Sequence, residues 1–181
     1  MTRDDSRHEN DVDDRYNVVE MVARPLYFGL GVNVLAPASL LMVCYWVANH
    51  YHVGDSIPQY ADIVFYVFVA LSLGQAAYAL MWRGRAFKEP LCRRKETIEQ
   101  DVKHGILTRS RRVFLLIASI SIWGFIFFPL TGRFQETALF VVFSFVVFQV
   151  VRPRYGFVRK LLLYQEDLVE QGKLADEPSV R

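Results

Sequence analysis

The chain has 181 residues, of which 52% are apolar, and a formal net charge of +2 at pH 7. Its two cysteines, Cys44 and Cys92, exclude a disulfide framework, and it contains no CxxC, HExxH, P-loop, GxGxxG or GxSxG motif. We therefore predict no catalytic, cofactor-binding or metal site and no nucleic-acid partner. An enzyme whose catalytic groups gather from separate helix ends stays open as an alternative.

Four long apolar runs hold a single charged residue, Asp62, so charge is not spread along amphipathic elements. A helix needs roughly 20 apolar residues to cross a bilayer. The runs that come near this length cover residues 26–49, 60–82, 113–131 and 137–151. We predict an all-α polytopic membrane protein with four transmembrane helices, which form a domain over residues 25–151, and with amphipathic helices outside the membrane.

The first 24 residues hold four basic and seven acidic side chains. Such a polar stretch is typical of disorder, and we expect residues 1–14 to be disordered. Residues 16–22 contain apolar side chains that fall on one helical face ahead of Pro25, which suits the first turn of a helix. They predict a short interfacial helix before the first span, with a frayed tail as the alternative.

Within the first run, Gly29, Asn33 and Ala36 share one helical face. Small residues at this spacing let two helices approach closely, and the Asn33 amide can then donate or accept a hydrogen bond across the contact. Pro37 has no N–H for the carbonyl of Asn33, so we predict a kink there. We interpret this face as a packing surface. A polar path for an ion or a small solute is the alternative.

The second run carries a similar pattern. Ala70 and Gly74 form a small-xxx-small pair beside Gln75, and Gln149 is a polar residue deep in the fourth run. We assign these residues to helix packing as well. Asp62 is a possible ion site because it is an acid within an apolar run, but its position at the start of a helix also suits the helix dipole.

Residues 83–112 hold ten of the 21 lysines and arginines, and they form the cytoplasmic connection in our prediction. Leu91, Ile98, Val102 and Ile106 lie on one stripe, which predicts a basic amphipathic helix from Pro90 to Gly105. Such a helix can lie on an anionic leaflet, dock on a partner, or extend the neighbouring spans.

Residues 152–181 predict a second cytoplasmic amphipathic helix and a tail. The fourth run is short, so we expect its helix to begin at Phe134 and to cover residues 134–151. Basic residues next to the spans are predicted to contact the inner leaflet. They are Arg83, Arg85, Arg93, Arg94, Lys95, Arg111, Arg112, Arg152 and Arg154.

The distribution of Lys and Arg predicts the orientation. The connection over residues 50–59 has none and that between the third and fourth runs has only Arg133, so both face outward. The connection over 83–112 and both termini then lie in the cytoplasm. With no N-x-S/T site, the chain fits a bacterial inner membrane, and we expect it in the cell inner (plasma) membrane.

Rich packing surface and poor chemistry favour a non-catalytic accessory or scaffold subunit of a membrane complex, which binds another membrane protein or itself. A small transporter or channel component that acts as an oligomer is the alternative, because four helices enclose little lumen.

Overall fold

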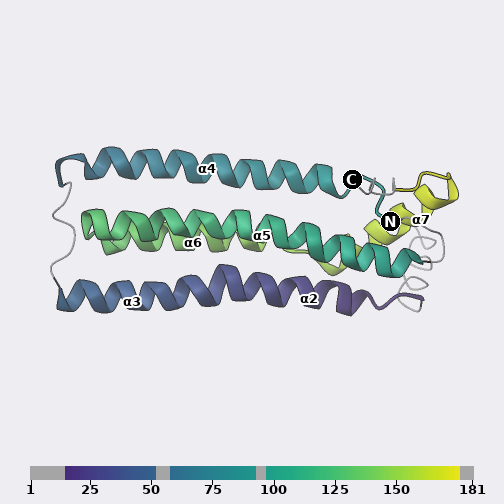
Figure 1. Ribbon diagram of the computed structural model, residues 1–181, viewed down its shortest axis with the longest axis horizontal. Coiled ribbons are helices and arrows are strands. Elements are labelled where there is room, and N and C mark those ends of the chain that lie inside the picture. Colours follow the sequence, from purple (N-terminus) through teal and green to yellow (C-terminus); the bar gives the residue numbers. More distant parts are fainter. Residues whose placement is uncertain (1–14, 52–57, 93–96, 176–181) are drawn as a thin grey trace, which may run out of the picture. The chain divides into compact units, whose positions relative to one another are not determined.

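A computed structural model describes residues 15–51, 58–92 and 97–175. Every regular element within these ranges is a helix (Figure 1). Four helices are long and apolar enough to cross a membrane, which confirms the predicted all-helical class with four apolar helices. These helices are Val18–His50, Ala61–Arg85, Ile98–Thr131 and Phe134–Val151. The tail over residues 1–14, for which we predict disorder, lies outside the described residues.

The chain divides into two compact units. Unit 1 combines Met1–Tyr27, Arg83–Arg111 and Pro153–Arg181, and unit 2 combines Phe28–Trp82 with Arg112–Arg152.

The first long helix consists of α2 (Val18–Leu30), a π-helical turn (Gly31–Leu35) and α3 (Ala36–His50). Residues 18–22 belong to this long helix and not to a separate interfacial helix, because α2 continues through Pro25 without a break. The irregularity lies just before Pro37, where the N–H of Ala36 donates to the carbonyl of Gly31, five residues earlier. The effect expected at Pro37 thus takes the form of a widened turn.

A 3₁₀ turn (Pro58–Tyr60) leads into α4 (Ala61–Ala86), and α5 follows over Ile98–Thr131. The prediction of a helix from Pro90 to Gly105 is wrong at both ends, because α5 begins at Ile98 and passes through Gly105. A Cβ atom at Gly105 would come within 2.7 Å of the Leu91 side chain. Gly105 therefore allows close packing rather than ending the helix.

The connection from α5 to α6 (Phe134–Val151) is a tight turn at Gly132 and Arg133. Gly132 has a φ of 67°, and its N–H donates to the carbonyl of Phe128 at 2.7 Å, as is common at helix ends. After α6, α7 covers Tyr155–Glu170.

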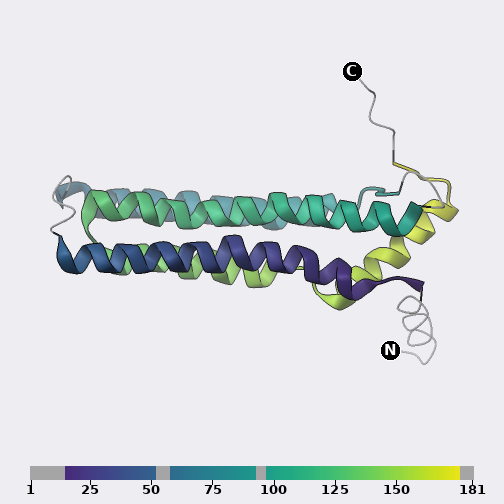
Figure 2. The same cartoon turned by 60° about the horizontal axis from the view of Figure 1, so that its bottom comes forward.

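Within unit 2, α5 and α6 lie between α4 on one side and α3 on the other (Figures 1 and 2). The α5–α6 pair approaches closely at Gly124, where a Cβ atom would come within 2.9 Å of the Thr137 carbonyl oxygen and of Phe140 Cβ. The Thr137 hydroxyl donates to the Gly124 carbonyl at 3.2 Å. Small and hydroxyl-bearing residues thus join these two helices.

Unit 1 has its own apolar core, built from the N-terminal part of α2, the segment between α4 and α5, the start of α5, and α7. The apolar sides of the amphipathic segments face one another there. Its buried members are Val18, Met21, Phe87, Cys92, Val102, Ile106, Val158, Leu161, Leu162 and Val169. The stripe containing Val102 and Ile106 is therefore covered by the chain itself.

Candidate functional site

Asn33 is the most deeply buried polar residue of the first long helix, with none of its surface exposed. Its Nδ2 donates to the carbonyl of Gly29 at 3.2 Å, one turn earlier. Its Oδ1 is buried and has no hydrogen-bond partner among the described residues. An unpaired acceptor in an apolar interior costs about 1–3 kcal/mol, so this oxygen marks a site that needs a donor.

The predicted face of Gly29, Asn33 and Ala36 is only partly buried. Gly29 and Asn33 point inward, but Ala36 is exposed and Pro37 is buried in its place. A π-helical turn holds one residue more than an α-helical turn, so the inward face moves on by one position after it. This shift explains why helical spacing predicts Ala36 on the wrong side.

Two aromatic rings from other helices contact the helix at Gly29. A Cβ atom there would clash with the ring of Phe148 in α6 and come within 2.9 Å of the ring of Phe114 in α5. The two rings pack edge to face with centroids 5.2 Å apart. Gly29 is thus required for close packing of three helices.

Ser144 of α6 is fully buried, and its hydroxyl donates to the carbonyl of Ile117 in α5 at 3.0 Å. The contacts of Gly29 with Phe148 and of Tyr45 with Phe134 show that the first helix and α6 are antiparallel. Asn33 lies one turn after Gly29, and Ser144 lies one turn before Phe148. The register therefore brings Asn33 and Ser144 to one level.

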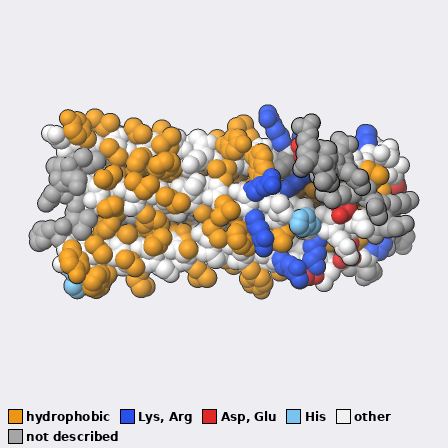
Figure 3. Space-filling view, viewed as in Figure 1, with side chains coloured by type: hydrophobic (Ala, Val, Ile, Leu, Met, Phe, Trp, Pro, Cys, Tyr) orange, Lys and Arg blue, Asp and Glu red, His pale blue; other side chains and the backbone are white. Residues whose placement is uncertain are grey.

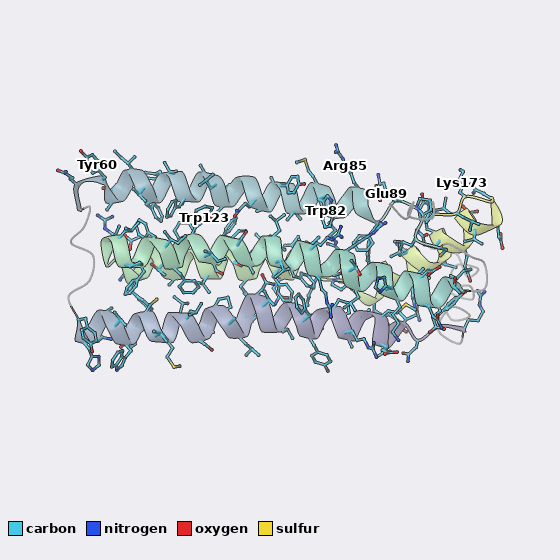
Figure 4. The ribbon with its side chains drawn as sticks, viewed as in Figure 1. Tyr60, Trp82, Arg85, Glu89, Trp123 and Lys173 are labelled. Carbon is cyan, nitrogen blue, oxygen red and sulfur yellow. The ribbon has the colours of Figure 1, made fainter. Side chains whose placement is uncertain are left out.

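Gln75 connects α4 to α5. The indole N–H of Trp123 donates to Gln75 Oε1 at 3.0 Å, and the Trp123 ring packs against Phe68 with centroids 5.1 Å apart. Figure 4 shows Trp123 on the side of α5 that faces α4. Gln75 thus joins α4 to α5 through a tryptophan that the spacing of polar residues does not reveal.

Ala70 and Gly74 lie on the exposed face of α4, away from Gln75. They belong to a stripe with alternating spacings of four and three residues, which we name the outer seam. It consists of Ile63, Val67, Ala70, Gly74, Ala77 and Met81, all exposed. A Cβ atom at Gly74 would meet nothing within 4 Å. Packing within the chain therefore gives no reason for a glycine at this position.

A small apolar groove lies beside the core side of α4. It is lined by Phe65, Val69, Ser72 and Leu73 of α4 and by Leu139, Phe140 and Phe143 of α6. Ser72 is 1% exposed, and its hydroxyl has no hydrogen-bond partner among the described residues. No pattern in the sequence distinguishes Ser72 from the other serines.

Asp62 lies in the first turn of α4, and its side chain is 76% exposed. Its carboxylate forms an ion pair with Arg133, which also approaches Glu136 at 3.7 Å. The hydrogen bond to Asp62 raises the pKa of Arg133. Asp62 thus joins the start of α4 to the turn between α5 and α6.

Gln149, the polar residue that we predict deep in the fourth run, is half-buried in α6.

Basic side chains gather where the apolar stretches of the helices end (Figure 3). Arg85, Arg111, Arg112 and Arg154 are exposed, whereas Arg152 is half-buried. The Arg83 guanidinium lies 5.0 Å from the centroid of the Phe157 ring. Three further predicted contacts, Arg93, Arg94 and Lys95, lie outside the described residues.

Unit 1 contains a buried polar residue that the sequence does not single out. Gln165 of α7 is fully buried; its Oε1 accepts the N–H of Leu91 at 2.7 Å, and its Nε2 donates to the carbonyl of Glu89 at 3.2 Å. These bonds satisfy backbone groups of the segment between α4 and α5. Because Gln165 falls among polar residues of an amphipathic helix, only its register with Leu161 and Leu168 indicates an inward position.

Charged groups of unit 1 are mutually paired at its surface. The Tyr16 hydroxyl and the Arg15 guanidinium both donate to Glu166 Oε1, at 2.7 and 3.0 Å. Partial burial, the hydrogen bond to Glu166 and the charge of Glu166 raise the pKa of Tyr16 to about 12. Lys103 donates to Glu20 at 2.7 Å, and this bond lowers the pKa of Glu20.

Within residues 15–51, 58–92 and 97–175, no three His, Cys, Asp or Glu side chains converge to hold a metal ion. Cys92 is 1% exposed in the core of unit 1, and burial raises the pKa of its thiol to about 11.

The chain matches no family model, no curated protein and no solved structure. Its function must therefore be inferred from the arrangement of its own residues.

Proposed function

We propose that the four apolar helices are transmembrane spans in the cell inner membrane, with both termini and unit 1 in the cytoplasm. The excess of Lys and Arg in residues 83–112 and the near absence of these residues from the two other connections support this orientation. The exposed arginines at the ends of the apolar stretches, Arg85 and Arg154 among them, then contact the anionic inner leaflet.

Labelling of single cysteines from outside the cell tests this orientation. His50 and Gln171 are both exposed at helix ends. In a chain without Cys44 and Cys92, a membrane-impermeant maleimide is expected to label His50→Cys in intact cells and Gln171→Cys only after lysis. Labelling of Gln171→Cys in intact cells would contradict the orientation.

Within the membrane, the protein acts as a non-catalytic accessory or scaffold subunit that binds another membrane helix through the outer seam of α4. The observation that carries this proposal is the position of Gly74. Glycine costs a helix about 1 kcal/mol relative to alanine, yet no atom of the described residues lies within 4 Å of the position that a Cβ atom at Gly74 would take. A partner helix that approaches the backbone closely would use that space.

The two sides of α4 support the same interpretation. Its inner side buries Ala61, Ser72, Ala76 and Ala79. On the same side, Phe65 packs against rings of both α5 and α6, and Phe68 packs against α5. Its outer side also carries small residues, Ala70, Gly74 and Ala77, and these are exposed to the rest of the described chain. A spacing of alternating four and three residues is typical of helices that pack at a shallow crossing angle. The outer seam therefore has the form of a second packing surface.

Substitution of Gly74 by leucine tests the proposal. The larger side chain meets open space in the isolated chain, so the fold is expected to persist, while close approach of a partner helix is blocked. The protein is purified in mild detergent, and the mass of the complex and its components are measured. We expect the wild-type chain to carry a stoichiometric second protein or a second copy of itself, and Gly74→Leu to lose it.

Ala38→Leu is the matched control, because Ala38 is an exposed small residue of α3. It is expected to retain the partner. A wild-type chain that purifies alone and as a monomer, or a Gly74→Leu variant that keeps its partner, would contradict the assignment. A symmetric oligomer that conducts ions in liposomes would instead favour a transporter or channel component.

A further inference from the structure

The π-helical turn around Asn33 presents a hydrogen-bond acceptor to the interior of unit 2. Asn33 is fully buried, and its Nδ2 is occupied by the carbonyl of Gly29. Its Oδ1 has no donor among the described residues, although the rings of Phe114 and Phe148 pack one turn away. Buried polar atoms in proteins are almost always paired, either with protein groups or with bound water.

The neighbouring helices offer acceptors at this level. The hydroxyl proton of Ser144 is directed to the carbonyl of Ile117 at 3.0 Å, which leaves the lone pairs of Ser144 Oγ as acceptors. The antiparallel register brings Ser144 to the level of Asn33. Two acceptors, Asn33 Oδ1 and Ser144 Oγ, thus lie at the same level of the helices in the interior of unit 2.

The absence of charged residues near Asn33 and Ser144 determines which kind of ligand can bind there. No Asp, Glu, Lys or Arg occurs within residues 26–54, 56–61, 63–82, 113–132 or 137–151. A cation would have no counter-charge at this depth, and an anion would face acceptors only. A neutral molecule that donates two hydrogen bonds matches both acceptors. Water is the smallest such molecule.

We propose that unit 2 holds a bound water molecule at the π-helical turn, which donates one O–H to Asn33 Oδ1 and the other to Ser144 Oγ. The wide turn before Pro37 turns Asn33 inward and the following Ala36 outward, and so directs the amide oxygen to the interior. The site lies within the bundle and does not depend on the proposed partner of α4.

Hydroxyl-radical footprinting tests the site on the intact protein in detergent. X-ray radiolysis of a bound water molecule modifies side chains next to it even when bulk solvent cannot reach them. Phe148 is fully buried and Phe114 is 1% exposed. We expect modification of at least one of these two rings in the wild-type chain. Phe127, which is also fully buried but contacts Phe65 and Phe140, is the internal control and stays unmodified.

Asn33→Leu replaces the amide by an apolar group of similar volume and is expected to abolish the modification of Phe114 and Phe148. Ser144→Ala removes the second acceptor and is expected to lower the modification of the two rings. If Asn33→Leu does not fold, Ser144→Ala tests the water site by itself. Unmodified rings in the wild-type chain, or equal modification in the folded variants, would overturn the assignment. Dependence of the modification on sodium or potassium would overturn it in favour of a cation.

Discussion

Unit 1 and unit 2 differ in how they treat their apolar side chains. In unit 1, the apolar faces of α7, of the start of α5 and of the start of α2 pack into one core, and its polar groups are paired at the surface. In unit 2, large apolar residues of α3 and α4 remain exposed along the length of each helix, including Met42, Trp46, Ile63 and Tyr66. The apolar faces of unit 1 are therefore covered by its own chain, whereas unit 2 leaves a large apolar surface uncovered by the described residues.

A second difference lies within unit 2. In the most apolar stretches of α5 and α6, 44% and 39% of the residues are buried, against 17% in the first helix and in α4. The four helices are similar in composition, but α5 and α6 are joined by two buried hydroxyl groups, those of Ser144 and Thr137, and by the close approach at Gly124. Apolar character thus determines where a helix can lie, and small and hydroxyl residues determine which helices it contacts.

A large effect is expected at Gly124, and the same substitution at Gly74 tests the contrast between the two sites. A methyl group at Gly124 would come within 2.9 Å of the Thr137 carbonyl oxygen and of Phe140 Cβ, so backbone atoms must move. We expect Gly124→Ala to lower the free energy of unfolding by about 2 kcal/mol, as overpacking does in protein cores. The measurement is an unfolding titration in detergent, followed by circular dichroism.

Gly74→Ala is the control for this comparison, since a methyl group there meets nothing within 4 Å. Its free energy of unfolding is expected to stay the same or to rise by up to about 1 kcal/mol, because alanine is the better helix former. Equal destabilisation by the two substitutions would contradict the distinction between a closed pair of helices and an open seam.

Gln165 provides the corresponding test in unit 1. Gln165→Leu keeps the volume of the side chain but leaves the N–H of Leu91 and the carbonyl of Glu89 without their partner. We expect a loss of about 2 kcal/mol of stability, the usual cost of unpaired buried polar groups. Gln171→Leu, at an exposed residue after α7, is the control and should change stability little. If Gln165→Leu left the free energy of unfolding unchanged, the hydrogen bonds of Gln165 to Leu91 and Glu89 would not stabilise unit 1.

The sequence predicts the four apolar helices well, because exclusion of charge over about 20 residues leaves few other structures. It predicts their contacts less well. The small residues at Gly29 and Gly74 look alike in the sequence, but one is covered by Phe148 and the other is open. Which of two similar faces turns inward depends on side chains from distant segments, and these are not visible in a single helix.

Two local features also cannot be predicted from the sequence pattern. The π-helical turn at Gly31–Leu35 adds a residue to one turn, so faces counted at regular spacing shift after it, as Ala36 shows. In unit 1, the helical period indicates an apolar stripe but not what covers it. The stripe containing Val102 and Ile106 is covered by the chain rather than by a membrane surface, since α7 supplies a matching face with Val158 and Leu162.

The smallest effect is expected at Tyr16, at the edge of unit 1, and it depends on pH. The pKa of this tyrosine is raised from 10.0 to about 12 by partial burial, by its hydrogen bond to Glu166 and by the charge of that carboxylate. The neutral phenol is therefore favoured in the folded chain. Its contribution is complete below pH 10 and is lost as the pH rises through 12, where the folded state must ionise as well.

Tyr16→Phe removes this alkaline loss, whereas the wild-type chain should lose less than about 1 kcal/mol between pH 10 and 12, because solvent screens a half-exposed group. The difference in absorbance at 295 nm between the wild-type chain and Tyr16→Phe isolates this phenol from the other eight of the nine tyrosines. Its midpoint should lie near 12 and move toward 10 in Glu166→Gln. A midpoint near 10 in the wild-type chain would mean that Tyr16 is not held against α7, and the closed surface of unit 1 would then be incomplete at its N-terminal edge.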